Sequence, residues 1–287
     1  MKRLLLYLTV CLLLVCAAAC APAQPEQPAQ PEQPAQPAQP EQPAQPEQPA
    51  QPVAAPSVAA SDVQALSYTL DTQTQSEKDD DGATLIDAKS AFPVVTLPNK
   101  AAAAKINAAF AEEKRDFDEN CKEYAAEARE DRALRGTDDF PTYAYETVYS
   151  VARCDQSVVS FLSDSYIYLG GAHGTSLREG VSFDIATGKK LDLEDITTVT
   201  EKEAEAFVLD YLKTALKEPQ YTALGLFDGY EAYLPDIVDE DGCFYLTYEG
   251  VVIVINDSEI ASHAAGMIEV VIPYADFTIL KDAYKPQ

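Results

Sequence analysis

The chain of 287 residues carries 47 acidic and 21 basic side chains, so its formal net charge is -26 at pH 7. This charge excludes nucleic acid as a partner, because proteins bind nucleic acid through Lys and Arg side chains that neutralise phosphates. It favours cationic partners, such as basic proteins, peptides or metal ions, although acidity also serves simply to keep an exported protein soluble.

The N-terminus has the layout of a bacterial lipoprotein signal. Lys2 and Arg3 give a basic start, and residues 4–15 form an apolar run that is short for a membrane-spanning helix. Small residues then lead directly to Cys20, whose thiol would take the lipid. We therefore predict a signal peptide over residues 1–19 and an extracytoplasmic protein that the lipid on Cys20 anchors to the bacterial cell membrane. An ordinary secretory signal, cut close to the same point, is the alternative.

Residues 20–60 are predicted to form the lipidated Cys and a stalk. From residue 21 to residue 52 a Pro recurs at almost every third position, and no large apolar side chain is present. Such a sequence cannot bury a core and should adopt polyproline II, which at ~3.1 Å per residue reaches roughly 100 Å. The stalk would hold the folded part of the protein away from the membrane.

Three Cys residues follow Cys20, at positions 121, 154 and 243. An odd number allows at most one disulfide within the chain, and their spacing fits no zinc motif. The sequence leaves open whether Cys154 and Cys243 meet. We expect buried, unreactive thiols at all three positions.

The first half of the folded region, from residue 61, combines strands with one long helix. Residues 63–71 and 91–97 have the composition of β-strands, and Pro93 would place the second strand at a sheet edge. Asn99 is a suitable N-cap for a helix over residues 100–135, where apolar side chains recur at helical spacing.

The second half contains more strands and a shorter helix, which Thr200 and Glu203 begin as a capping box. Runs of antiparallel strands with one long and one shorter inserted helix predict an α+β fold with antiparallel sheets. The expected elements are a hairpin over 143–154 and 157–169, a glycine-rich loop at 170–174, a strand at 176–186, a helix at 200–217, a hairpin over 244–249 and 251–255, and a strand at 268–272.

Several short motifs occur in a fixed order. They are Tyr-Leu-Gly-Gly-Ala-His-Gly at 168–174, Phe-Asp-Ile-Ala-Thr-Gly at 183–188 and Ile-Pro-Tyr at 272–274. Together they resemble a domain of unknown function at the C-terminus of RsiV-type anti-sigma factors. The preceding part looks like the domain found beside it there and in PdaC-type peptidoglycan deacetylases. On this basis we divide the folded region into an N-terminal domain, 61–165, and a C-terminal domain, 166–287.

This resemblance implies a binding or sensing role. RsiV-like proteins bind lysozyme directly and pass the signal through a membrane-spanning segment, whereas PdaC-like proteins carry their catalysis in a separate metal-dependent module. Neither that segment nor that module is evident in this sequence. We therefore expect neither an anti-sigma factor of that design nor an enzyme.

Four side chains are candidate ligand-binding residues: Tyr168, His173, Asp184 and His263. The two His residues are the only ones in the chain, and a metal site would need both of them beside carboxylates. Sequence alone does not bring them together, so we predict no metal and no cofactor. The glycines at 170–174 do not form a P-loop and are expected to take positive φ in a turn.

The sequence gives little support for other catalytic or metal-binding sites. No Ser lies in a Gly-x-Ser-x-Gly elbow, so no catalytic residue is predicted. Acidic runs at 77–88 and 236–242 lack the ligand spacing of an EF-hand and are expected to be solvated loops, with loose binding of divalent cations as the alternative. The alternating Tyr143, Tyr145 and Tyr149 either pack within a sheet or present an aromatic face to a partner.

The sequence thus predicts a cell-surface lipoprotein whose non-enzymatic domain binds lysozyme or another basic wall-active protein. One alternative is a module that binds cell-wall glycan or peptide, for which peptidoglycan would be the partner. The other is a hydrolase with a pocket that joins His173 or His263 to carboxylates.

Overall fold

The computed structural model describes residues 66–136 and 140–286. The predicted signal peptide, Cys20, the stalk and the first residues of the strand predicted at 63–71 lie outside the described residues. None of the helices in the described ranges combines the length and the apolar character needed to cross a membrane.

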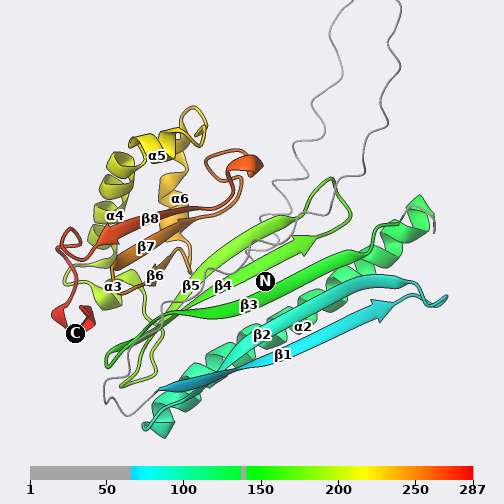
Figure 1. Ribbon diagram of the computed structural model, residues 1–287, viewed down its shortest axis with the longest axis horizontal. Helices are drawn as coiled ribbons and strands as arrows, with labels where there is room; N and C mark the ends of the chain where they lie inside the picture. Colours follow the sequence, from blue (N-terminus) through cyan, green and yellow to red (C-terminus); the bar gives the residue numbers. More distant parts are fainter. Residues whose placement is uncertain (1–65, 137–139, 287) are drawn as a thin grey trace, which may run out of the picture. The chain divides into compact units, whose positions relative to one another are not determined.

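A five-stranded sheet forms the first part of the fold (Figure 1). Its strands lie in sequence order, and every neighbouring pair is antiparallel except β2 and β3, which are parallel. The parallel pair arises because the long helix α2 (Lys100–Arg135) connects the two strands and returns the chain to the start of the sheet. The strands are β1 (Ser67–Lys78), β2 (Thr84–Thr96), β3 (Tyr143–Cys154), β4 (Val158–Tyr168) and β5 (Thr175–Asp184).

Helix α2 begins and ends where the sequence predicts. The Asn99 side chain accepts hydrogen bonds from the backbone N–H groups of Ala101 and Ala102, and Gly136 ends the helix with a φ of 90°. The apolar stripe of α2 packs on one face of the sheet, where Phe110 contacts the ring of Phe161 at a centroid distance of 5.1 Å.

The Tyr residues that alternate along β3 point into this layer. Tyr145 stacks on Phe117 at 4.3 Å between ring centroids, and Tyr149 contacts Phe110 at 5.2 Å. Tyr143, Tyr145 and Tyr149 are all buried. The interpretation that they pack within the sheet is therefore confirmed, and the alternative of an exposed aromatic face is wrong for these three residues.

The prediction that Pro93 marks an edge strand is wrong. Strand β2 lies inside the sheet, and β1 is the edge. Pro93 is tolerated because the ladder between β2 and β3 runs only from Ile86 to Ala91, so the proline lies beyond it.

The second part of the fold is a three-stranded antiparallel sheet covered by helices (Figure 1). Helix α4 begins with the predicted Thr200–Glu203 capping box. Buried side chains such as Val208, Leu212 and Phe277 form its core with the strands. The elements are α3 (Leu193–Ile196), α4 (Glu201–Ala215), α5 (Pro219–Thr222), α6 (Leu234–Asp239), β6 (Phe244–Leu246), β7 (Gly250–Ile255) and β8 (Ile268–Pro273), with 3-10 turns η1 (Tyr230–Ala232), η2 (His263–Ala265) and η3 (Asp282–Tyr284).

The α+β fold class is confirmed, with antiparallel pairing dominant. Part of the acidic run at 236–242 is helical in α6, where the sequence predicted a loop, because Leu234, Ile237 and Val238 are buried. The domain boundary that we predict between residues 165 and 166 lies within β4, all of which pairs in the first sheet.

The two sheets meet at Gly180 of β5. Its N–H donates to the carbonyl of Gly242 at 2.8 Å. A Cβ atom at position 180 would lie 2.1 Å from the carbonyl oxygen of Phe244, so only glycine fits this crossing.

We expect Gly180→Ala to lower the free energy of unfolding by about 1–3 kcal/mol or more, because the methyl group has to push the backbone of β6 away. Urea denaturation measures the change. Gly171→Ala is the matched control, since its nearest atom would be 3.8 Å away and its φ is not positive. Equal effects of the two substitutions would contradict this account of the crossing.

Candidate functional site

The fold brings the two His residues of the chain together. His173 lies in the loop between β4 and β5, and His263 lies in η2 between β7 and β8. Their ring centroids are 4.1 Å apart, and the ring planes differ by 15°. The pair therefore joins a loop of the first sheet to a loop of the second.

Hydrogen bonds orient both imidazole rings in the same way. The Nδ1 atom of His173 lies 3.0 Å from the carbonyl oxygen of Gly174, and the Nδ1 atom of His263 lies 2.5 Å from Oδ2 of Asp257. Both oxygen atoms accept hydrogen bonds, so Nδ1 carries the proton in each ring. In the neutral form of either ring the lone pair then lies on Nε2.

Asp257 is the buried anion of this group, with a side chain only 3 % exposed. Besides His263 it accepts a hydrogen bond from the Ser258 hydroxyl at 2.9 Å, and Ser258 takes a left-handed φ of 67°. Among the described residues His263 is its only ion-pair partner. Because Ser258 donates to the carboxylate rather than to an imidazole, the group is not a Ser-His-Asp triad.

The other two predicted site residues lie at opposite ends of one hairpin. Tyr168 ends β4 near the His pair, whereas Asp184 ends β5 beside Val158, at the far end of β4. Asp184 caps a turn, where its Oδ1 accepts from the N–H and the hydroxyl of Thr187, each at 2.8 Å. The structure thus brings His173 and His263 together and places Asp184 away from them.

Of the glycines at 170–174, only Gly170 takes a positive φ, of 75°. Position 174 requires glycine for a different reason: a Cβ atom there would lie 2.4 Å from the ring of Tyr166. The expectation of positive φ therefore holds for one glycine, and close approach of Tyr166 explains another.

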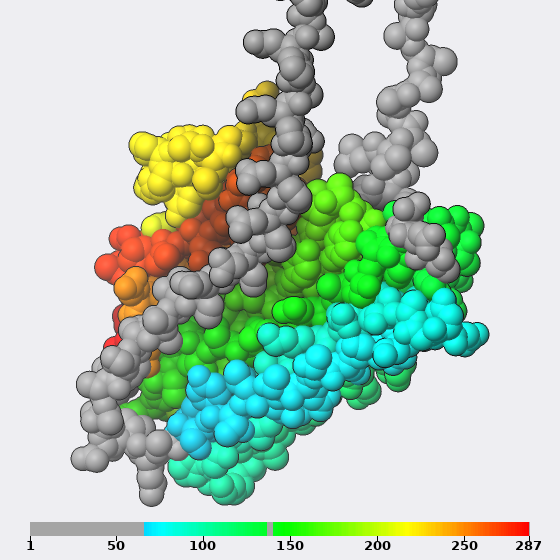
Figure 2. Space-filling view, turned by 45° about the vertical axis from the view of Figure 1, so that its right-hand side comes forward, coloured from blue at the N-terminus to red at the C-terminus, as the bar shows by residue number. Residues whose placement is uncertain are grey.

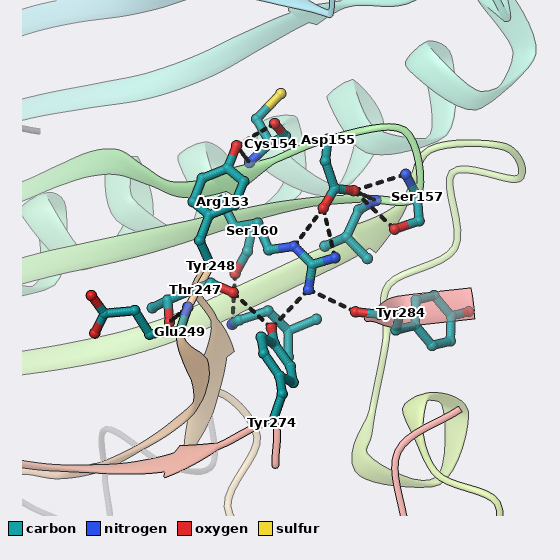
Figure 3. Close-up of polar contacts among 12 residues, drawn as sticks. Arg153, Cys154, Asp155, Ser157, Ser160, Thr247, Tyr248, Glu249, Tyr274 and Tyr284 are labelled. Carbon is teal, nitrogen blue, oxygen red and sulfur yellow. Dashed lines mark hydrogen bonds and ion pairs between the residues drawn. The ribbon is translucent and has the colours of Figure 1, made fainter. Parts of the chain in front are cut away.

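A buried guanidinium at the junction of the sheets was not predicted (Figure 3). Arg153 is fully buried; it donates to Asp155 Oδ2 at 2.7 Å, to the Tyr274 hydroxyl at 2.7 Å and to the Tyr284 carbonyl at 2.7 Å. The Tyr274 hydroxyl in turn donates to the carbonyl of Thr247 at 2.7 Å. This cluster has a structural role, because it connects the end of β3 to one end of the second sheet, at Tyr274 and Thr247, and to the C-terminal turn η3.

Asp155 is held in its charged form. Burial acts to raise its pKa, but hydrogen bonds from Ser157 and Val158 and the charge of Arg153 outweigh that effect, and its pKa lies below the usual value. Its Oδ1 accepts from the Ser157 N–H at 2.9 Å and from the Ser157 hydroxyl at 2.8 Å.

An acidic segment with exposed aromatic side chains lies around α5, η1 and α6. Between residues 218 and 280 the sequence contains no Lys or Arg. Phe227 is 42 % exposed and Tyr233 is 54 % exposed. The segment around α5 is yellow in Figure 2, at the surface of the second part of the fold. The acids of the stretch are Glu218, Asp228, Glu231, Asp236, Asp239, Glu240, Asp241, Glu249, Asp257, Glu259, Glu269 and Asp276.

The acids at 79 and 81 lie in the exposed turn between β1 and β2. Both carboxylates form ion pairs with Arg132 of α2, whose side chain is 8 % exposed. The pKa of Asp79 is lowered by the N–H of Asp80 and by Arg132. The cluster therefore ties the hairpin between β1 and β2 to the helix, so the solvated loop that the sequence predicts also has a structural contact.

The three thiols are free. Burial raises the pKa of Cys121 to about 11 and the pKa of Cys243 to about 12, so neither is a nucleophile at neutral pH. The prediction of buried thiols is confirmed for these two, while Cys154 is half-buried. In the described ranges no group of three or more His, Cys, Asp or Glu residues is arranged to hold a metal ion.

Comparison with known proteins finds two family models along the chain. Residues 78–176 match the model described as deacetylase PdaC, and residues 194–275 match that of a protein of unknown function, DUF3298. A search of the curated proteins found no match.

Two solved structures of DUF3298 family members are similar to this chain. One, from Bacteroides fragilis, has 18 % sequence identity and a TM-score of 0.59, and the match covers 76 % of this chain and 95 % of that chain. Another, from Pseudomonas aeruginosa, has 16 % identity and a TM-score of 0.47, covering 78 % and 98 %. At these identities the Bacteroides structure supports the fold alone.

We expect Asp155→Asn to lower the free energy of unfolding at pH 7 by about 3–5 kcal/mol, because it leaves the buried Arg153 charge without its partner. The folded pKa of Asp155 is depressed, so its contribution is full above the unfolded value of about 3.9 and is lost as pH falls through the folded value. The variant should therefore lose less stability than the parent below pH 4. Urea denaturation across this pH range measures both effects.

Asp210→Asn, at an exposed position of α4, is the control and should change stability by less than about 0.5 kcal/mol. An Asp155→Asn variant as stable as this control would show that the Arg153 cluster does not hold the sheets together.

Proposed function

We propose that the protein is a lipid-anchored, extracytoplasmic binding protein without catalytic activity, and that it captures a basic wall-active protein such as a lysozyme. The observation that carries the proposal is the segment from 218 to 241, where exposed aromatic side chains lie among carboxylates and no cation is present in the sequence. RsiV-type sensing of lysozyme is the nearest parallel that the resemblance offers.

Hydrogen bonds hold the backbone of this segment at Phe227 and the side chain of Tyr221 against neighbouring parts of the fold. The Phe227 N–H donates to the Ile260 carbonyl at 2.8 Å, and the Tyr221 hydroxyl donates to the Glu269 carbonyl at 3.1 Å. A preorganised aromatic surface loses little conformational entropy on binding, and Tyr and Phe are common in the centres of protein interfaces.

The negative charge of this surface favours a cationic partner. Asp228 and Asp236 are exposed beside Phe227 and Tyr233. Carboxylates at the rim of an interface steer a cationic partner and raise its association rate, whereas aromatic anchors at the centre supply most of the affinity. A basic protein with an apolar patch is the partner that fits both features.

A non-enzymatic role also agrees with the chemistry of the described residues. The hydroxyl of Ser258 donates to Asp257 and not to the imidazole of His263, so this pair does not have the arrangement of a nucleophile with its general base. The matched family model has a deacetylase in its name. In PdaC-type proteins a separate metal-dependent module carries the deacetylase activity.

We expect the chain produced from Ala21 to bind hen lysozyme with one-to-one stoichiometry at physiological salt. Phe227→Ala and Tyr233→Ala should each weaken binding at least about tenfold, since buried aromatic anchors are typical hot spots. The triple variant Asp228→Asn, Glu231→Gln, Asp236→Asn should slow association and reduce the salt dependence. Calorimetry and surface-based kinetics measure these effects.

The matched control neutralises three exposed acids on α2, with Glu119→Gln, Glu123→Gln and Glu130→Gln. Its charge change equals that of the triple variant. Equal loss of binding in both triple variants would mean generic charge attraction and would overturn the proposed surface. Absence of lysozyme binding, together with salt-resistant binding of peptidoglycan fragments, would favour the glycan-binding alternative.

A further inference from the structure

We propose that strand β1 (Ser67–Lys78) is a self-association edge, which pairs antiparallel with β1 of a second copy of this chain. The two five-stranded sheets then join about a two-fold axis into one continuous sheet. The edge belongs to the first part of the fold and does not include the acidic segment from 218 to 241.

The other strands that end a sheet have contacts on their outer sides. The first sheet ends in β1 and β5, and the second ends in β6 and β8. Strand β5 meets β6 at Gly180, and the Leu246 N–H of β6 donates to the Ser160 hydroxyl at 3.0 Å. On β8 the carbonyl of Glu269 accepts from the Tyr221 hydroxyl at 3.1 Å. Because unpaired backbone groups of an edge strand recruit other chains, these contacts protect β5, β6 and β8 from strand addition.

The outer side of β1 is open (Figure 1). Among residues 66–136 and 140–286, only β2 forms hydrogen bonds with the backbone of residues 67–77. Every residue of the strand except Gln75 is exposed. Strand β1 therefore presents a row of backbone N–H and C=O groups that another strand can pair with.

The sequence of β1 lacks the devices that usually protect an edge strand. The strand is 12 residues long, whereas strands average about 5–6 residues, and it contains no Pro. Its only Lys is the last residue, and the irregularity in its pairing with β2 lies at that same end, between Glu77 and Lys78. Residues 72–76 read Thr-Gln-Thr-Gln-Ser, a neutral run in which Thr favours a strand.

The charges along β1 favour a second copy over a basic partner. The strand carries Asp71, Glu77 and Lys78, and two cations of α2 reach it. Lys114 donates to a Gln side chain of the strand at 2.5 Å, and Arg129 donates to the carbonyl of Lys78 at 3.5 Å. The acids of this edge are thus matched by cations, in contrast to the segment from 218 to 241. Two such edges approach each other without the repulsion that the net charge of the chain imposes elsewhere.

The same charges select a register. Opposite residues of an antiparallel pair lie on the same face, so the two-fold axis of two identical strands passes through a residue. An axis at Thr74 sets Asp71 opposite Glu77 of the second copy, which is unfavourable. An axis at Gln73 sets Asp71 opposite Gln75 and still overlaps the neutral runs. The pair is therefore centred on Gln73, with Thr72 of each copy opposite Thr74 of the other.

The test is analytical ultracentrifugation of the chain produced from Ala21. We expect a dimer whose fraction rises with protein concentration. Thr72→Lys combined with Thr74→Lys should weaken dimerisation at least about tenfold, because the new like charges face each other across the axis. Thr72→Lys combined with Thr74→Glu should strengthen dimerisation, because opposite charges then face each other.

The matched control places the same two charges elsewhere. Ala206→Lys combined with Thr214→Lys, at exposed positions of α4, should dimerise at least as well as the parent. General electrostatics predicts stronger dimerisation for both double Lys variants, because the chain has a net charge of -26. Only strand pairing at β1 predicts a loss for the variant at 72 and 74. Circular dichroism checks that each variant is folded.

A cross-link tests the register. Opposite Cα atoms of an antiparallel pair lie about 4.5–5.5 Å apart, within the range of a disulfide. Gln73→Cys should therefore form a disulfide between copies under oxidising conditions, whereas Glu146→Cys, exposed on β3, should not. A chain that stays monomeric up to millimolar concentration would overturn the proposal. Parent-like dimerisation of the double Lys variant at 72 and 74, or a dimer without the Gln73→Cys cross-link, would overturn it as well.

Discussion

Arg153 is the residue on which the arrangement of the two sheets depends. Its guanidinium is fully buried at the end of β3, and its partners come from three places: the turn that follows β3, Tyr274 after β8 and the backbone of Tyr284 near the C-terminus. A buried charge without partners costs several kcal/mol, so the segments that carry those partners have to be in place when the protein is folded. The junction is therefore specified by polar groups as well as by apolar packing.

The glycine at 180 sets the second condition for this junction. It lets the backbone of β5 approach β6 closely, and nearby the Ser160 hydroxyl, which bonds Ser182 across β4 and β5 at 2.8 Å, accepts from the N–H of Leu246 of β6 at 3.0 Å. Interior hydroxyls need such partners, because an unbonded buried polar group is costly. Close packing and polar bonding at the junction thus require the same small residue, and they fix where the loops of the two sheets meet.

Sequence reasoning located the elements whose cause is local. Asn99 caps α2, Thr200 and Glu203 begin α4, and the hairpin between β3 and β4 follows from its alternating strands. Sequence reasoning failed where an element depends on contacts with residues far away in the sequence. The position of Pro93 depends on how far β3 pairs along β2, and the helical form of α6 depends on burial of its apolar side against a core that the local pattern does not reveal.

The same division applies to the candidate site. The motif around residue 173 drew attention to the loop after β4, but 90 residues separate His173 from His263 and no local pattern links them. Asp257 has no sequence feature that marks it as a buried partner, and Asp184 was singled out by a motif whose structural cause is a turn. Only the junction between the sheets shows which of these residues can act together.

The charges are also divided unevenly along the chain, and this supports a binding surface in the second part of the fold. In the first part, carboxylates are matched nearby, as Asp79 and Asp81 are by Arg132 and Asp131 is by Arg135. In the second part, the stretch from 218 to 280 has acids and exposed aromatic rings but no Lys or Arg in its sequence, and the cation that pairs with its Glu269 is Arg178 of β5. Repulsion within such a surface is relieved by an external cation. A basic protein bound at the aromatic segment would supply that charge, and its own apolar side chains would cover the exposed rings of Phe227 and Tyr233.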